Sequence, residues 1–273
     1  QYIPNAVTSI EYSTFEGCTS LASINIHEAI TKIGASAFSN CSALASINIP
    51  NSVTEIGGAA FDGTAWFNKQ TDGLVYAGKV AYTYKGIMPS GTFISINEGT
   101  VSISPYCFHN CSGLTSVTIP NSVTSIGASA FYICTGLTSV DIPNSVTLIG
   151  SDAFKGCSNI EVLDIDNNKF ASISSFSYSR KKIKTFILGN SVTTVGNEAF
   201  KDCSGLTSVT MPNSVTTIGS SAFSGCSGLP SVEIPNAVSS IGDSAFSDCR
   251  LLQHVTIGSN ASAIGDNAFK NCK

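Results

Sequence analysis

The chain has 273 residues, of which 42% are hydrophobic and only 12% charged, and its formal net charge is -4. This apolar content is enough to bury a large core, which excludes a disordered chain. The acidic balance excludes a nucleic-acid partner held by long-range attraction to phosphate. No segment approaches the roughly 18 apolar residues of a membrane helix, so we expect no direct membrane insertion of this chain.

A unit of 23 residues recurs along the chain. The stretch from Ile119 to Phe131 reads Ile-Pro-Asn-Ser-Val-Thr-Ser-Ile-Gly-Ala-Ser-Ala-Phe, and the pattern begins again at Ile142. A fixed period of this length indicates a solenoid, because so short a unit has no core of its own and must stack on its neighbours. Regular coils begin at Ile3, Ile26, Ile49, Ile96, Ile119, Ile142, Leu188, Met211, Ile234 and Ile257, and irregular coils at residues 72 and 165 bring the expected number to twelve.

One coil contains several expected elements. Residues 114–119 alternate inward and outward side chains and predict a strand of a parallel sheet, which Pro120 ends at a corner. Residues 123–126 predict a second short extended run. Gly127 then supplies either a positive φ or room for a close backbone approach. Residues 130–134 are too few for a stable α-helix and predict a 3₁₀ or single helical turn.

The unit Leu-x-x-Val-x-Ile-Pro-x-x-Val-x-x-Ile-Gly-x-x-Ala-Phe-x-x-Cys, as in residues 114–134, resembles the BspA-like class of bacterial leucine-rich repeats. The resemblance extends from Ile3 to Cys272 and includes nine copies of the Phe-x-x-Cys step. It implies that residues 1–273 form a single right-handed leucine-rich-repeat solenoid. Its parallel sheet would lie on one side, with short strands and 3₁₀ or helical turns on the other. The resemblance also implies adhesion to host matrix proteins or other cells.

The first interruption of the repeat covers residues 64–95. Thr64 replaces the expected Cys, and residues 74–86 predict a hairpin of two short strands around Ala77–Gly78. Aromatic side chains are enriched in binding hot spots, so the aromatic residues here form a candidate ligand-binding surface. The alternative is that the rings pack the hairpin onto the solenoid. The candidates are Trp66, Tyr76, Tyr82 and Tyr84.

The second interruption is a degenerate coil at residues 165–187. Ile173 comes one residue late, Phe176 one residue early, and Ser179 takes the place of the Cys. A basic run follows and is a candidate contact for an acidic glycan or phosphate. The alternative is a solvated face, because neither interleaved aromatic residues nor a Gly-rich loop accompanies the run. The candidates are Arg180, Lys181, Lys182 and Lys184.

Ten cysteines raise the question of disulfides. Nine of them occupy one column of the repeat, and Cys107 occupies the column that usually holds Ala. Equivalent Cβ atoms in stacked coils lie roughly 4.8 Å apart and parallel, beyond the usual disulfide range of roughly 3.5–4.5 Å. We therefore expect buried free thiols that act as small apolar fillers.

The sequence contains few other motifs that could indicate a metal site or a catalytic site. Asp164 to Asn168 resembles the opening of a calcium loop, but Lys169 stands where that loop needs Gly and Ser175 where it needs Glu, so a surface turn is expected. The three histidines, at positions 27, 109 and 254, occupy different positions in their coils. We therefore expect no metal, no cofactor and no catalytic residues.

The outward residues of the parallel sheet, such as Ser116 and Thr118, form a strip of small polar side chains. This strip either contacts a partner weakly over a wide area or merely keeps the sheet soluble. The functional hypothesis is a non-enzymatic module of a bacterial cell-surface or secreted protein that binds a host extracellular-matrix or cell-surface protein, or a glycan. The alternatives are a structural spacer that carries another domain and an intracellular interaction scaffold. We expect both chain ends to be boundaries within a longer protein.

Overall fold

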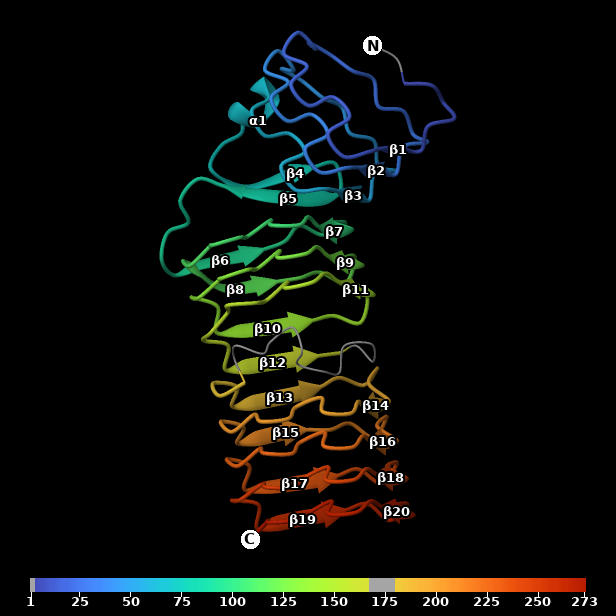
Figure 1. Cartoon of the computed structure of the whole chain (residues 1–273), viewed down its shortest axis with the longest axis vertical. Helices are drawn as coiled ribbons and strands as arrows, with labels where there is room; N and C mark the ends of the chain where they lie inside the picture. Colours follow the sequence, from blue (N-terminus) through green and yellow to red (C-terminus); the bar gives the residue numbers. More distant parts are fainter. Residues whose placement is uncertain (1–2, 167–179) are drawn as a thin grey trace.

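The chain forms a solenoid whose coils stack along the longest axis of the molecule (Figure 1). The structure is a computed structural model that describes residues 3–166 and 180–273. One side carries the longer strands and the other side carries the two-residue strands, with turns between them. This arrangement confirms the solenoid with a parallel sheet on one side. In the described residues, no helix combines the length and the apolar character needed to cross a membrane.

The longer strands pair in parallel between neighbouring coils, in three separate sheets. Residue partners are 23 positions apart, as in Val140 with Leu163 and Leu163 with Phe186, so equivalent side chains lie above one another. The repeat period therefore sets the register of the sheet. These strands are β6 (Thr92–Ser95), β8 (Leu114–Thr118), β10 (Ser139–Ile142), β12 (Val162–Ile165), β13 (Thr185–Leu188), β15 (Ser208–Thr210), β17 (Ser231–Ile234) and β19 (His254–Ile257).

The two-residue strands form parallel ladders with the same period. Gly127 follows the strand β9 (Ser125–Ile126), and a Cβ added to it would lie 2.3 Å from the backbone nitrogen of Pro105. Close backbone approach, rather than a positive φ, therefore explains this glycine. The strands are β1 (Ser9–Ile10), β2 (Lys32–Ile33), β3 (Glu55–Ile56), β7 (Ser102–Ile103), β9 (Ser125–Ile126), β11 (Leu148–Ile149), β14 (Thr194–Val195), β16 (Thr217–Ile218), β18 (Ser240–Ile241) and β20 (Ala263–Ile264).

The core consists of stacked columns of identical side chains. The phenylalanine column shows this well, because the rings of Phe131 and Phe154 are parallel within 3° with centroids 5.0 Å apart. The Phe108 and Phe131 rings stack at the same distance. Each ring is fully buried and touches only the coils beside it, so the core is built by nearest-neighbour contacts along the stack.

The segment expected to form a 3₁₀ or helical turn consists of successive turns instead. Alternate amides form hydrogen bonds outside their own coil. The N–H groups of Ser129, Phe131 and Ile133 donate to carbonyls of the next coil at 2.8–2.9 Å. The intervening amides close turns within the coil, as Cys134 N does with Phe131 O at 3.2 Å. A helical turn would keep every amide inside its own coil and leave the carbonyls of the next coil without donors. We call this row of coil-to-coil hydrogen bonds the turn ladder.

The turn ladder places two residues of each coil in the left-handed backbone region. In one coil these are Ser129, with φ of 53°, and Ile133, with φ of 56°. At the second position most coils carry Gly, Asn or Asp, the residues that adopt this conformation most readily. Ile133 is the β-branched exception, and its conformation is strained.

The cysteine column carries a hydrogen bond as well as apolar bulk. Cys134 Sγ donates to Phe108 O, and Cys157 Sγ donates to Phe131 O, each at 3.0 Å and each in the preceding coil. All ten cysteines lie in the described residues and are free, eight of them buried. The expectation of buried free thiols is confirmed for these eight, while Cys18 is exposed and Cys272 is half-buried.

The interior of the degenerate coil lies outside the described residues. The predictions for Ile173, Phe176 and Ser179, and those for the calcium-like turn at 168, 169 and 175, fall there. At both ends of that coil the register is regular, because Ile165 pairs with Leu188. The spacing between β12 and β13 is therefore 23 residues, as between strands of regular coils.

Replacing Ile133 by Gly should stabilise the protein. A β-branched residue in the left-handed region is strained by about 1–2 kcal/mol, and Gly removes most of that strain. We expect a higher melting temperature in thermal unfolding, with a gain of about 1 kcal/mol. The control is Leu148→Gly, another exposed apolar residue but in the strand β11, with no positive φ. It should lower the melting temperature, and an Ile133→Gly variant that is also less stable would contradict the strain.

The reactivity of each thiol should decrease as its burial increases. Burial raises the pKa of the Cys111 thiol to about 11 and that of Cys249 to about 12, so little thiolate forms at about pH 8. In the native protein an aromatic disulfide reagent should label Cys18 fastest, then Cys272, and the other eight only on unfolding. In denaturant without reductant all ten should react, and any smaller number would show a disulfide.

Candidate binding groove at the interrupted coil

A hairpin interrupts the solenoid after the third coil, as the sequence predicts. Strand β4 (Gly73–Ala77) pairs antiparallel with β5 (Val80–Lys85). The turn between them contains Gly78 in the left-handed region, with φ of 58°. The start of β5 takes the place of a two-residue strand, because Val80 and Ala81 pair with β7. The hairpin therefore substitutes for one regular coil.

The short helix α1 (Ala65–Asn68) leads into the hairpin and is tied to it. Thr64, in the cysteine column, accepts a hydrogen bond from Phe67 N at 3.0 Å as the N-cap. Lys85 Nζ, from the end of β5, donates to the carbonyls of Phe67 at 3.1 Å and Asn68 at 2.9 Å. The charged end of β5 thus closes the last turn of α1 and fixes the hairpin against the third coil.

The hairpin breaks the turn ladder. Phe61 N donates to the hydroxyl of Tyr82 at 3.0 Å, and not to a carbonyl of a following coil. Ser36 N and Asn40 N, one coil earlier, bond to the third coil at 3.1 and 2.7 Å. Their equivalents in the third coil are Ala59 and Gly63, and within residues 3–166 and 180–273 these two amides have no hydrogen-bond partner. The break therefore leaves two open donors.

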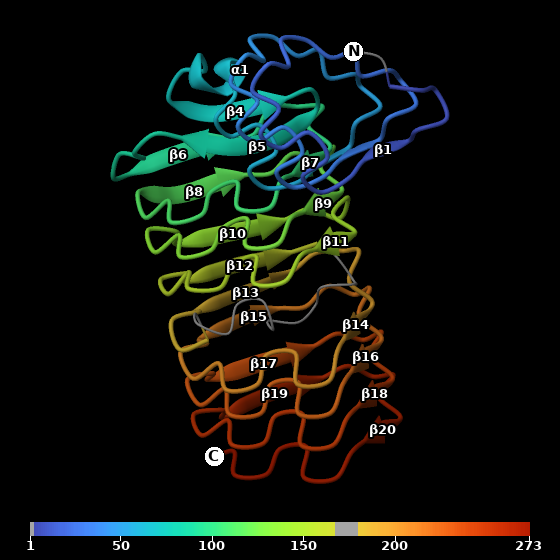
Figure 2. The ribbon, with the colours of Figure 1, turned by 45° about the horizontal axis from the view of Figure 1, so that its top comes forward.

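The core divides at the same place. One buried cluster runs from Ile3 to Tyr82, and the other runs from Ala81 to Ala268. Ala81 and Tyr82 are neighbours on β5 and point to opposite faces, as successive strand residues do. In Figure 2 the coils before the hairpin lie at an angle to the stack that follows it. The hairpin is thus a joint between two packed stacks.

A groove of about 530 Å³ lies at this joint. Its size falls in the range of small-ligand sites. Gly58 is one feature that opens it, because a Cβ there would lie 3.0 Å from Cδ2 of Tyr106. We call this the junction groove. Its lining combines the second and third coils, the hairpin and the next coil: Lys32, Gly34, Ala35, Glu55, Gly57, Gly58, Ala59, Asp62, Tyr82, Thr83, Pro105 and Tyr106.

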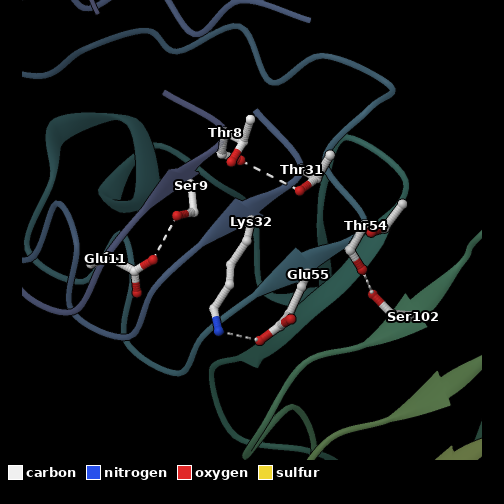
Figure 3. Close-up of polar contacts among 8 residues, drawn as sticks. All are labelled: Thr8, Ser9, Glu11, Thr31, Lys32, Thr54, Glu55 and Ser102. Atoms are coloured by element: carbon white, nitrogen blue, oxygen red, sulfur yellow. Dashed lines mark hydrogen bonds and ion pairs between the residues drawn. The ribbon is translucent and has the colours of Figure 1, made fainter. Parts of the chain in front are cut away.

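The charges of the junction groove are one cation and two carboxylates. Lys32 Nζ and Glu55 Oε1 form an ion pair at 3.1 Å, in which both side chains are substantially exposed (Figure 3). Such a pair contributes little stability. Asp62 Oδ1 accepts a hydrogen bond from the Tyr82 hydroxyl at 3.1 Å, and no cation of the described residues pairs with this carboxylate. The groove therefore carries a net negative charge.

A second hollow of about 290 Å³ extends the groove along the two-residue strands. It shares Glu55 and Pro105 with the junction groove. Beside it the Ser102 hydroxyl donates to Thr54 O at 2.6 Å, across the hairpin (Figure 3). Between the first and second coils the corresponding contact joins the Thr31 hydroxyl to Thr8 O at 3.4 Å. The two hollows together follow the edge of the third coil.

Tyr82 is a core residue. Its side chain is 1% exposed and packs edge-on against Phe61 and Phe67, with ring centroids 5.4 and 6.0 Å away. Burial raises the pKa of the Tyr82 phenol above its usual range, so the hydroxyl keeps its proton and donates to Asp62. This corrects the expectation that Tyr82 contacts a ligand: its ring is shielded, and it supports the groove from beneath.

The other predicted aromatic residues are half-buried and lie outside the junction groove. Trp66 packs edge-on against Phe61 at 5.1 Å. The Tyr76 hydroxyl accepts a hydrogen bond from Asn97 N at 2.9 Å. Tyr84 packs against the second core cluster. All three contribute to packing of the hairpin, and a role in ligand contact stays a prediction for them.

The predicted basic run lies beside β13, away from the groove (Figure 1). Lys184 forms an ion pair with Glu161 at 2.9 Å. Lys181 and Lys182 are exposed, and Arg180 is half-buried. The structure does not bring these residues together with the aromatic candidates, and their contact with an acidic glycan or phosphate stays a prediction.

Sequence reasoning missed a row of rings beside the groove. Tyr106 and His109 have centroids 5.7 Å apart, and His109 stacks on Tyr132 at 5.1 Å and 4°. Tyr106 is 53% exposed and sits in the left-handed region with φ of 61°. A strained aromatic residue on a surface is a reason to suspect function. The available signal was that equivalent positions of the other coils carry small, polar or acidic residues.

A separate acidic hollow lies at the corner after the longer strands. It contains Glu98, Asp141, Asp164 and Asp166. Burial and the neighbouring carboxylates raise the pKa of Asp141 and Asp164. In the described part of the chain no three His, Cys, Asp or Glu side chains are grouped to hold a metal ion. This hollow is therefore weaker as a site than the junction groove.

Comparison with known proteins identifies the repeat. A family model described as a BspA-type leucine-rich repeat region, in six copies, matches residues 2–70, 81–206 and 171–273. No curated protein matches the chain significantly. The first matched range ends just before the hairpin, and the second begins within β5. The break in the matched sequence therefore coincides with the joint in the structure.

Several solved structures resemble the chain. A leucine-rich repeat protein from Bacteroides ovatus is 28% identical with a TM-score of 0.55, over 99% of this chain and 84% of that one. A leucine-rich cell surface protein from Faecalibacterium prausnitzii is 29% identical with a TM-score of 0.38, over 99% and 76%. A leucine-rich repeat protein from Eubacterium ventriosum is 21% identical with a TM-score of 0.49, over 90% and 82%.

Replacing Tyr82 by Phe should destabilise the protein. The change leaves the buried amide of Phe61 without its acceptor, and an unsatisfied buried donor costs about 1–3 kcal/mol. Thermal unfolding should show a lower melting temperature. Tyr84→Phe is the matched control, because the Tyr84 hydroxyl makes no hydrogen bond among the described residues, and it should change little. Equal melting temperatures for the two variants would contradict the role given to Tyr82.

Proposed function

Because the chain belongs to the BspA-type leucine-rich repeat family, we propose that it is a non-enzymatic binding module of a bacterial cell-surface or secreted protein. It acts in adhesion or host interaction. Its partner is a host extracellular-matrix or cell-surface protein, or a glycan. The observation that supports this most is the junction groove, which combines the exposed ring of Tyr106, a net negative charge and the open amide of Ala59.

The repeat itself supplies a scaffold and little recognition. Its Ile, Val, Phe and Cys columns are buried, and residues such as Pro120 and Gly127 serve corners and close backbone approach. Side chains available to a partner are those where the pattern changes, and Tyr106 is the clearest among them. A rigid scaffold that presents an irregular segment is a common arrangement of binding proteins. These observations support recognition at the joint.

Binding, rather than catalysis, suits the chemistry of the groove. Of its titratable groups, Lys32 and Glu55 pair with each other, and Asp62 is held by Tyr82. Tyr82 stays protonated and buried, so it does not act as a base. This arrangement offers no nucleophile next to a base of the kind that covalent catalysis uses.

A structural spacer is the second candidate function. The observation in its favour is the regular stacking of the Phe column, which gives a stiff body, and many outward sheet residues, such as Ser116 and Thr118, are short and polar. An intracellular scaffold is the third, and the free cysteines are compatible with it. The first candidate differs from both in requiring a specific ligand at the joint.

Tyr106→Ser should remove ligand binding without harming the fold. Ser is the commonest residue at this left-handed position in the other coils, so the melting temperature should not fall. The measurement is binding of the intact chain to arrays of extracellular-matrix proteins and glycans. An aromatic hot-spot residue contributes about 2 kcal/mol or more, so affinity for any captured ligand should drop at least about 30-fold.

The matched control is Tyr12→Ser. Tyr12 is 73% exposed and lies outside the junction groove. This variant should bind as the parent does. Binding that survives Tyr106→Ser would place recognition elsewhere, and an absence of binding to any arrayed ligand would favour the spacer.

A further inference from the structure

The break in the turn ladder leaves a backbone carbonyl, as well as a backbone amide, without a hydrogen-bond partner among the described residues. In regular coils the residue after the repeat glycine offers its carbonyl to the preceding coil: Ala35 O accepts from Ser13 N, and Ala128 O accepts from Tyr106 N. Pro105 occupies this position in the coil after the hairpin. Its carbonyl accepts no hydrogen bond from the described residues, just as the N–H of Ala59 donates none. Both residues line the junction groove.

An open donor and an open acceptor on the walls of one groove fit a ligand that carries both. A peptide unit does so, because its C=O accepts from an amide and its N–H donates to a carbonyl. Protein segments commonly bind by such main-chain pairing at an exposed edge, while side-chain pockets supply specificity. The elongated shape of the groove, which continues past Glu55 and Pro105 into the second hollow, suits a chain more than a compact molecule.

The charge of the groove selects the side chain of such a segment. The Asp62 carboxylate has no cationic partner, whereas Lys32 is already paired with Glu55. The half-exposed ring of Tyr106 lies in the same groove. A carboxylate and an aromatic face together attract an ammonium or guanidinium group. An acidic segment would instead meet two carboxylates.

We propose that the junction groove binds an extended peptide segment of a partner protein that carries a Lys or Arg side chain. Ala59 N–H and Pro105 O pair with the peptide backbone. Asp62 receives the cation, and the Tyr106 ring covers it. The Tyr82 hydroxyl holds the Asp62 carboxylate in place from below. This inference rests on the proposed binding function and narrows its partner to a basic peptide.

A neutral glycan is the competing occupant. Its hydroxyls can also donate and accept, and its ring face can stack on Tyr106. It has no cation, however, so it cannot pair with the exposed Asp62 carboxylate. The peptide is favoured for this reason, and the glycan serves as one outcome of the test.

The test measures retention of two hexapeptide mixtures by the intact chain in equilibrium dialysis. Both mixtures have blocked ends and random residues at every position except the third, which is Lys in one mixture and Glu in the other. The Lys mixture should be retained at least about tenfold more, as expected for one close charge pair. The same Lys mixture with N-methylated backbone amides should lose most of its retention, because it cannot donate to Pro105 O.

Asp62→Asn should remove the preference for Lys while it keeps the hydrogen bond with Tyr82, since the amide oxygen still accepts. Glu16→Gln is the matched control, because Glu16 is an exposed carboxylate at the same position of the first coil. It should leave the preference intact. Equal retention of the two mixtures, or a Lys preference that survives Asp62→Asn, would overturn the proposal.

The two proposals fail in different ways. If neither mixture is retained while the chain still captures a matrix protein or glycan in a Tyr106-dependent manner, the basic peptide is wrong and the binding function stands. If the chain also captures no arrayed matrix protein or glycan, the binding function itself is wrong. A neutral oligosaccharide that binds through Tyr106 and is unaffected by Asp62→Asn would assign the groove to the glycan.

Discussion

Each coil satisfies its backbone through the coils beside it, and the rest of the structure depends on this constraint. On the turn side, alternate amides such as those of Ser129 and Phe131 donate to the next coil. That geometry requires left-handed residues at two positions, a glycine where the backbones approach, and an apolar column beneath. The Cys side chain adds a hydrogen bond to the preceding coil at the level of the Phe carbonyl. The residue types that recur in the repeat are therefore those that the contacts between coils require.

The period and the buried columns could be predicted from the sequence, because each follows from recurrence of one residue type. The hairpin could also be predicted, since alternating residues flank Gly78. The turn ladder could not, because residues 130–134 look like a short helical turn until the neighbouring coil shows where their amides bond. The choice between packing and ligand contact for Tyr82 could not be made for a similar reason: its hydroxyl has its partners in Phe61 and Asp62, about twenty residues away.

The candidate site arises where the constraint is broken. A hairpin takes the place of one coil, and its residues Tyr82 and Ala81 each pack into one of the two core clusters. The same replacement leaves Ala59 N–H and Pro105 O without a hydrogen-bond partner among the described residues. Tyr106 marks this place in the sequence, since it departs from its column, and Gly58 lies opposite it. Tyr106 could be noticed without a structure, but its contact with Gly58 could not, because the two belong to different coils separated by the hairpin. The core thus tolerates the interruption that creates this candidate site.

Residue-resolved amide hydrogen exchange of the free protein tests the account most directly. The account predicts slow exchange for the amides of Ser36 and Asn40, which pair with the third coil, and for Phe61, which pairs with Tyr82. It predicts fast exchange for Ala59 and Gly63, the equivalent positions at the break. Protection of Ala59 and Gly63 equal to that of Ser36 and Asn40 would show that the turn ladder continues through the joint, and would contradict the account.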